Sequence, residues 1–167
     1  DFYSIKASLG KVYQKAVLFA DDPLANIAER QKEVSARAVH PENLTQPTLA
    51  GFDVRSKSEA LIANALAERK IPFIYEEELT LFLPGRGEVI LHPDFVILLP
   101  SGKKIIWEHL GMLSEDFYLS AFSEKLKLYH TTGYQINSTL FLTTDTPDGR
   151  LDMDAVMNVI DIISGYF

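Results

Sequence analysis

Apolar residues in the first third of the chain recur at roughly helical spacing, with Leu24, Ile27 and Val34 as examples. Asp22-Pro23 places a capping side chain directly before a proline in a first helical turn, which predicts a helix start. The segment from His40 to Gly51 contains two prolines and several polar residues. Because prolines and polar residues interrupt helical spacing, we expect a linker there.

A second helix is predicted after Ser56-Lys57-Ser58-Glu59, which matches the capping box. In that motif the serine hydroxyl and the glutamate carboxylate bind backbone N–H groups that the first helical turn leaves free. An alanine- and leucine-rich stretch follows to about Lys70, and Pro72 ends it.

Three apolar stretches then predict strands, from Phe73 to Phe82, from Leu91 to Leu99 and from Lys104 to Leu110. Pro84-Gly85-Arg86-Gly87 separates the first pair. Pro100-Ser101-Gly102 separates the second pair, at a length typical of a hairpin.

The rest of the chain predicts a helix from Ser114 to Thr132, a strand from Ser138 to Thr144 and a helix from Leu151 to Ile163. The order of helix, three strands, helix, strand and helix predicts an α/β fold, with a mixed sheet flanked by helices. We divide the chain near Gly51, into an N-terminal helical segment with its linker (1–50) and an α/β core (51–167).

The composition narrows the classes of function. A chain of 167 residues suits one compact domain, and no apolar run approaches the roughly 18 residues that span a bilayer. With no cysteine, disulfides, thiolate metal sites and cysteine nucleophiles are excluded. The lack of cysteine fits a reducing compartment, and we expect a cytoplasmic protein without membrane contact.

The charge and the first residue add two expectations. The net charge is −7, so contact with nucleic acid requires a local basic patch or metal ions that mask acidic groups. The chain begins with Asp rather than Met, and we expect it to continue a longer polypeptide that has a further N-terminal domain.

Two carboxylates stand at the ends of otherwise apolar strands. Asp94 opens the strand that ends at Leu99, and Glu108 lies near the end of the next strand. Because hairpin neighbours bring such positions side by side, the two acids are expected to share one end of the sheet. Adjacent carboxylates favour a divalent cation with oxygen ligands, whereas a solvated strand end is the simpler interpretation for either acid alone.

His92-Pro93-Asp94, followed on the next strand by Glu108-His109-Leu110, resembles the PD-(D/E)XK nuclease superfamily in this order of elements. The resemblance covers residues 55 to about 144, and is strongest to a small bacterial branch with blocks like Arg55–Glu59, Pro93–Phe95 and Trp107–Met112. It implies a restriction-endonuclease-like core and metal-dependent hydrolysis of phosphodiester bonds, with DNA as the expected substrate and partner.

By the same resemblance, Asp94 and Glu108 bind Mg²⁺ or Mn²⁺, and Glu59 is a third catalytic acid and metal ligand. Glu59 is also fully explained as a helix cap. The superfamily places its lysine two residues after the second acid, where this chain has Leu110.

A lysine on the following helix is a candidate replacement. Tyr118, Phe122, Lys125 and Tyr129 fall on one helical stripe that faces the sheet, whereas Lys127 lies on a polar stripe. The resemblance implies that Lys125 takes over the catalytic role. The alternative is that Lys125 only extends along the helix to solvent.

Three further side chains are candidates for nucleic-acid binding. His92 shares a strand face with Asp94, and Arg55 and Lys57 flank a helix start, where a phosphate is favoured. Solvation at the surface explains all three equally well. His109 points to the opposite face from Glu108, and we expect it to be packed or hydrogen-bonded.

Other catalytic motifs are absent from the sequence, among them G-x-S-x-G, a P-loop and H-E-x-x-H. Two alternatives to a nuclease stay open. One is a degenerate nuclease fold that binds nucleic acid or a protein without cleaving, with Leu110 marking the lost site. The other is a plain α/β domain in which the acids meet by chance.

Overall fold

The computed structural model describes residues 26–111 and 116–167, and the predicted helix start at Asp22-Pro23 lies outside them. The helices are α3 (Ile27–Ala36), a 3₁₀ turn (Pro41–Asn43), α4 (Lys57–Glu68), α5 (Asp116–Thr131) and α6 (Met153–Ser164). The strands are β1 (Gln46–Pro47), β2 (Asp53–Val54), β3 (Phe73–Tyr75), β4 (Leu79–Leu83), β5 (Gly87–Leu91), β6 (Phe95–Leu98), β7 (Lys104–Leu110) and β8 (Leu140–Thr144).

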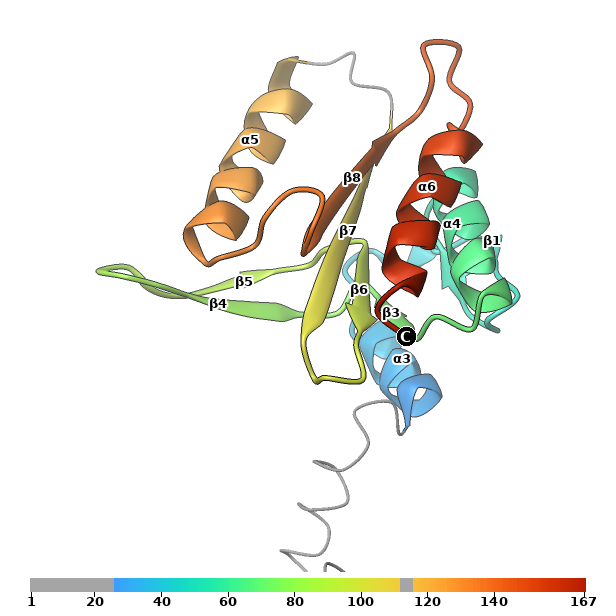
Figure 1. Ribbon diagram of the computed structural model, residues 1–167, viewed down its shortest axis with the longest axis horizontal. Coiled ribbons are helices and arrows are strands. Elements are labelled where there is room, and N and C mark those ends of the chain that lie inside the picture. Colours follow the sequence, from blue (N-terminus) through green and yellow to red (C-terminus); the bar gives the residue numbers. More distant parts are fainter. Residues whose placement is uncertain (1–25, 112–115) are drawn as a thin grey trace, which may run out of the picture.

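Four strands form the central sheet in the order β3-β6-β7-β8. β3, β6 and β7 pair antiparallel, and β8 joins β7 in parallel after the crossover through α5. Helices lie on both sides of this sheet, as Figure 1 shows, with α4 and α6 on one side and α5 on the other. The predicted mixed α/β fold is therefore confirmed.

Alternation along the strands divides the core into two apolar layers. Phe95, Ile105 and Trp107 point toward α4 and α6, where they meet Ile62, Leu66 and Ile160. The alternate positions of the strands pack on the other side with Tyr129 of α5 and with Leu79 and Leu81 of β4. Neighbours in sequence such as Trp107 and Glu108 therefore serve opposite faces of the sheet.

The single strand predicted from Phe73 to Phe82 is wrong. It is two strands, β3 and β4, because Glu76 adopts a left-handed backbone conformation (φ 52°) that ends β3. β4 pairs with β5 as a separate two-stranded ribbon, which extends away from the sheet in Figure 1. The strand predicted from Leu91 to Leu99 is likewise divided between the last residue of β5 and β6.

The predicted linker before Gly51 contains regular structure. Gln46 and Pro47 of β1 pair antiparallel with Val54 and Asp53 of β2, so this pairing crosses the boundary that we placed near Gly51. Two short strands are compatible with a proline-containing segment because an edge strand does not need every N–H.

Helix α3 is attached to the outer strand of the sheet through one buried side chain. The backbone N–H of Tyr75 donates to Gln31 Oε1 (2.7 Å), and Gln31 Nε2 donates to the carbonyl of Tyr75 (3.2 Å). Gln31 is only 4% exposed. The amide of Gln31 therefore gives β3 the hydrogen bonds that a further strand would otherwise provide.

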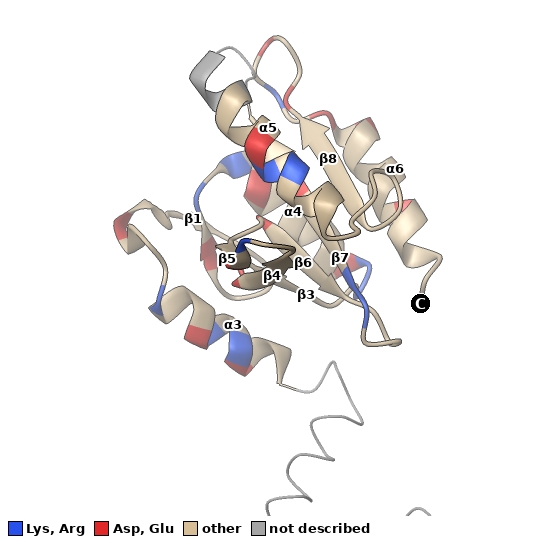
Figure 2. Cartoon of the chain, turned by 90° about the vertical axis from the view of Figure 1, so that its left-hand side faces the viewer, with Lys and Arg blue, Asp and Glu red and all other residues tan. Residues whose placement is uncertain are grey.

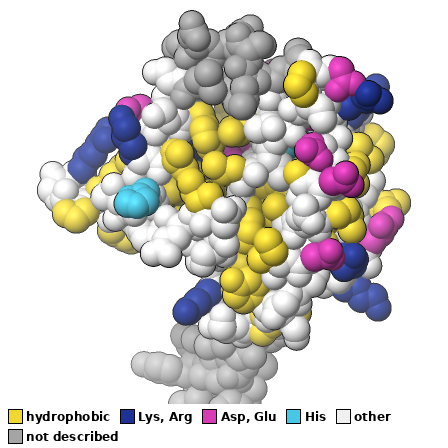
Figure 3. Space-filling model, turned by 45° about the horizontal axis from the view of Figure 1, so that its top comes forward, with side chains coloured by type: hydrophobic (Ala, Val, Ile, Leu, Met, Phe, Trp, Pro, Cys, Tyr) yellow, Lys and Arg dark blue, Asp and Glu magenta, His cyan; other side chains and the backbone are white. Residues whose placement is uncertain are grey.

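The charged side chains are dispersed over the described surface. Figure 2 shows acidic and basic positions close together along α3 and α5, and on the face in Figure 3 the Lys and Arg side chains stand apart from one another. Within the described residues, no helix combines the length and the apolar character that crossing a membrane requires.

Candidate functional site

Asp94 and Glu108 face each other across two neighbouring strands. Phe95 of β6 pairs with Trp107 of β7, and one step further along this antiparallel register brings Asp94 opposite Glu108. Asp94 stands directly before β6. By strand alternation, both acids point to the face of the sheet that α5 covers.

Asp94 is held by one backbone hydrogen bond. The N–H of His109 donates to Asp94 Oδ2 at 2.7 Å. Burial, and then the negative charge of Glu108, raise the pKa of Asp94 well above its usual range, while Lys125 acts in the opposite direction. The surroundings of Asp94 therefore favour the neutral carboxyl over the carboxylate.

Glu108 is buried and has two partners on α5. Its Oε1 atom lies 2.6 Å from Lys125 Nζ and accepts a 2.5 Å hydrogen bond from the hydroxyl of Tyr129. Burial and the charge of Glu108 raise the pKa of Tyr129, which keeps that hydroxyl protonated as a donor. Among the described residues, nothing donates to the second oxygen of either acid, Oδ1 of Asp94 or Oε2 of Glu108.

Lys125 reaches the acids from the helix. Its ammonium group also donates to the carbonyl of His92 at 3.1 Å, and its side chain is 24% exposed. Leu110, two residues after Glu108 on β7, is buried. Lys125 of α5 therefore lies beside Glu108, while its catalytic role stays a prediction.

Glu59 is held at the start of α4 by the predicted capping box. Its Oε2 atom accepts hydrogen bonds from the N–H of Ser56 (2.8 Å), the N–H of Arg55 (3.1 Å) and the hydroxyl of Tyr75 (3.0 Å). Its negative charge also contributes to the raised pKa of Asp94, which places the two acids within electrostatic range.

Within the described part of the chain, no three His, Cys, Asp or Glu side chains are grouped closely enough to hold a metal ion. The structure thus brings Asp94 and Glu108 together as a pair, whereas the carboxylate of Glu59 caps the N-terminus of α4. A role for Glu59 as third ligand stays a prediction.

The three candidate phosphate contacts have different surroundings. Arg55 is largely engaged, because its guanidinium binds Glu76 through Nε (2.5 Å) and Nη2 (2.9 Å) and also donates to two backbone carbonyls. Lys57, in the first turn of α4, and His92, beside Asp94, are exposed. A pocket of about 360 Å³ includes Arg55 and His92 in its lining.

Two tyrosines of the site were missed from the sequence. The helical stripe predicts only packing for Tyr129, although its position one turn after Lys125 is a signal that both reach the same acid. Tyr75, which donates to Glu59, gave no signal, because an aromatic residue in a strand is ordinarily core. The prediction for His109 is confirmed, since its ring lies on the opposite face and is hydrogen-bonded to Thr143 and Asp145.

The comparisons with known proteins give one partial relative. The chain is 30% identical over 125 residues to an uncharacterised protein of Methanocaldococcus jannaschii, MJ1519. The match covers 71% of this chain and 10% of the relative, so the chain corresponds to about a tenth of that protein's length. No family model matches the chain, and no solved structure matches it.

Proposed function

We propose that this chain is a metal-dependent nuclease with a restriction-endonuclease-like core of the PD-(D/E)XK type, and that it hydrolyses phosphodiester bonds in DNA. The observation that carries the proposal is the pair Asp94–Glu108 on adjacent strands, with the ammonium group of Lys125 2.6 Å from Glu108. The order of the central sheet, three antiparallel strands and a fourth in parallel, supports it.

The residues present suit a hard divalent cation. Asp94 and Glu108 each keep one carboxylate oxygen without a donor from the described residues, and Mg²⁺ and Mn²⁺ prefer oxygen ligands. Burial, and then the charge of Glu108, raise the pKa of Asp94, so ionised Asp94 beside Glu108 is unfavourable without a cation. Asp94 and Glu108 would hold the ion, with Glu59 as a third acid if it leaves its cap.

The chain's own groups then have separate roles. When bound, the cation supplies Lewis acidity and positive charge for the phosphodiester. Lys125 orients the attacking water and stabilises the negative charge that develops on the phosphate. Tyr129 fixes the carboxylate of Glu108 through its hydroxyl. Neutralising the acids is also what lets a chain of net charge −7 approach a polyanion.

Cleavage of supercoiled, linear and single-stranded DNA tests the proposal, with Mn²⁺, Mg²⁺ or chelator present. The wild-type chain should cut only with metal, and Asp94→Asn should abolish cutting while the protein stays folded. Asp154→Asn is the matched control, because Asp154 is an exposed acid on α6, far in sequence from the site. Asp154→Asn should cut at the wild-type rate.

One observation favours a second candidate, a degenerate module that binds nucleic acid or a protein without cleaving it. Leu110 occupies the strand position of the superfamily lysine and is buried. A chain that neither binds Mn²⁺ nor cuts any DNA or RNA substrate would favour this module. Cutting of RNA alone would keep the nuclease and correct its substrate.

A further inference from the structure

On the face of the sheet opposite to the acid pair, a series of hydrogen-bonded polar side chains links β7 to β8 and to the start of α4. Trp107 Nε1 donates to Thr143 Oγ1 (2.9 Å), and His109 Nδ1 lies 3.0 Å from the same oxygen. His109 Nε2 lies 3.1 Å from Asp145 Oδ1, which also accepts from the hydroxyl of Ser58 (2.9 Å). We refer to these five residues as the buried polar chain.

The directions of the hydrogen bonds in the buried polar chain follow from the chemistry of its ends. An indole N–H only donates, so Thr143 Oγ1 accepts from Trp107, and an ionised carboxylate only accepts, so His109 Nε2 donates to Asp145. In the neutral ring the proton stands on Nε2, and Nδ1 then accepts from the hydroxyl of Thr143. Every ring nitrogen of His109 is thereby bonded and its orientation is fixed.

Because these side chains are largely buried, breaking their hydrogen bonds would lower the stability of the fold. The His109 side chain is 3% exposed and that of Asp145 is 14% exposed, while Trp107 is fully buried. A buried polar group without a partner is destabilising, so each member holds its neighbour in one position. The buried polar chain is thus a rigid connection between β7, β8 and the first turn of α4.

Each of the three candidate acids is linked to a member of the buried polar chain, either as its neighbour in sequence or by a hydrogen bond. Glu108 directly precedes His109, and Glu59 directly follows Ser58. Asp94 accepts its hydrogen bond from the backbone N–H of His109 itself. The residue whose two ring nitrogens both lie in the buried polar chain is therefore also the residue whose amide holds Asp94.

We propose that His109 is a positioning residue for metal binding: its imidazole, fixed between Thr143 and Asp145, sets the peptide that orients Asp94 and Glu108 toward the cation. The proposal rests on the proposed function, because it needs a cation at the acid pair. His109 does not touch the cation or the substrate. It acts through its backbone N–H, which orients the ligand Asp94, as residues that hydrogen-bond to metal ligands commonly do.

The test compares His109→Phe, His109→Gln and the control Ile105→Val in the full chain. Phenylalanine fills the site but makes neither hydrogen bond, whereas the amide of glutamine can replace the donor to Asp145. Ile105 is a core residue of β7 on the same face as His109, and its trimming lowers stability without touching the buried polar chain. Mn²⁺ affinity is measured by titration, and exchange of the residue 109 amide proton is measured without metal.

His109→Phe should weaken Mn²⁺ binding by about 10- to 100-fold and speed exchange of that amide, as changes behind metal ligands commonly do. His109→Gln should recover most of the affinity, and Ile105→Val should bind as wild type does. If His109→Phe does not fold, Thr143→Val replaces it, with the same weakening of Mn²⁺ binding expected.

Equal Mn²⁺ affinity in the folded phenylalanine variant and the wild type would overturn the positioning role. So would a glutamine variant as weak as the phenylalanine variant, because packing alone would then account for both. A wild-type chain that binds no Mn²⁺ would instead overturn the proposed function, so the two failures are distinguishable.

Discussion

The hydroxyl of Tyr129 is the most informative single group to remove, because it donates to a carboxylate in the interior. Tyr129 is fully buried, Glu108 is 3% exposed, and their oxygens are 2.5 Å apart. Tyr129→Phe keeps the ring and its packing, and leaves Glu108 with Lys125 as its remaining partner. The perturbation is therefore the loss of one charge-assisted hydrogen bond in a site that water barely reaches.

The expected cost follows from this geometry. Hydrogen bonds to charged groups contribute about 1.5–3 kcal/mol, and leaving a buried carboxylate under-satisfied is at the upper end of such losses. For a domain of this size each kcal/mol lowers Tm by about 2–4 °C. Tyr129→Phe should thus lower Tm by about 3–12 °C.

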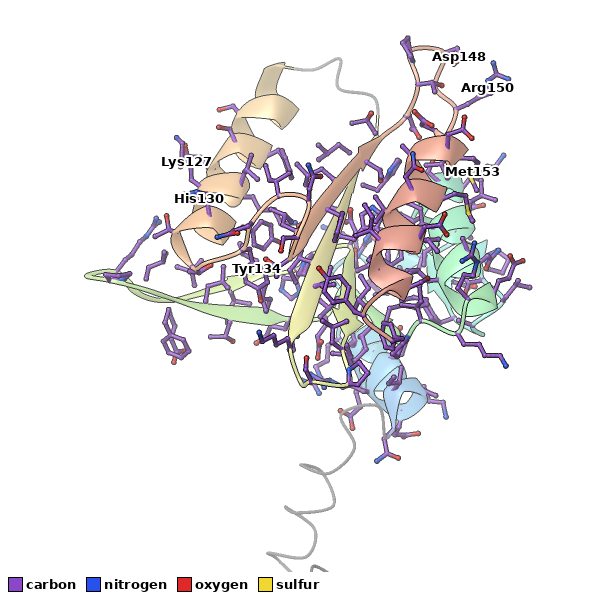
Figure 4. All side chains as sticks on the ribbon, in the orientation of Figure 1. Lys127, His130, Tyr134, Asp148, Arg150 and Met153 are labelled. Carbon is purple, nitrogen blue, oxygen red and sulfur yellow. The ribbon has the colours of Figure 1, made fainter. Side chains whose placement is uncertain are left out.

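Tyr134→Phe is the matched control. Its ring lies 5.8 Å from that of Tyr129, and its hydroxyl makes no hydrogen bond to the residues that the structure describes. Tyr134 lies beyond the end of α5, as Figure 4 shows. Thermal unfolding followed by circular dichroism, with chelator present, should show a change within about 0.5 kcal/mol for this control. If Tm falls equally in both variants, the hydrogen bond from Tyr129 to Glu108 does not stabilise the fold, and the description of Glu108 as a buried carboxylate that depends on Tyr129 is refuted.

Three further predictions concern the site and its attachment. Lys125→Ala should lower cleavage by about 10²- to 10⁴-fold, while Lys127→Ala, on the exposed side of α5 in Figure 4, should cut normally; equal activities would remove Lys125 from the mechanism. Because the pKa of Asp94 is raised, the protonated carboxyl stabilises the fold below its ordinary pKa of about 3.9, and this stability is lost as pH rises through the raised pKa. Asp94→Asn in chelator should therefore be at least as stable as wild type at neutral pH and less dependent on pH, as Tm measured across pH will show; a less stable variant at pH 7 would contradict the shift. Gln31→Ala should cost about 1–3 kcal/mol in urea unfolding, since it leaves a buried N–H and C=O of β3 without partners, and an unchanged midpoint would mean that water replaces the amide.

Local signals in the sequence were sufficient for most elements of the fold. The helix after Ser56 has both hydrogen bonds of the predicted capping box. α5 and β8 fall within the predicted ranges, and α6 ends one residue beyond its predicted end at Ile163. The division of the strand after Phe73 was missed because Glu76 takes a left-handed conformation that glutamate rarely adopts. The pairing of β4 with β5 in a separate two-stranded ribbon depends on tertiary contacts, which the local sequence pattern does not predict.

The candidate site divides in the same way. The spacing of Asp94 and Glu108 on hairpin strands was enough to place them side by side, and the helical stripe was enough to bring Lys125 toward the sheet. The hydroxyl partners Tyr75 and Tyr129 were not evident, because the sequence shows an aromatic ring and not the acid that its hydroxyl meets.

The amide of Gln31 also bears on where this chain can be shortened without exposing a strand edge. Among the residues that the structure describes, β3 pairs with β6 and with no second strand. An unpaired strand edge is a template on which another molecule can add a strand. Gln31 occupies that edge at Tyr75 with one donor and one acceptor. Helix α3 thereby covers the edge of β3 and hinders association through that edge. A shortened protein that starts at Gly51 would lack α3 and would leave the backbone groups of Tyr75 free to pair with another strand. The useful truncation limit therefore lies before Ile27.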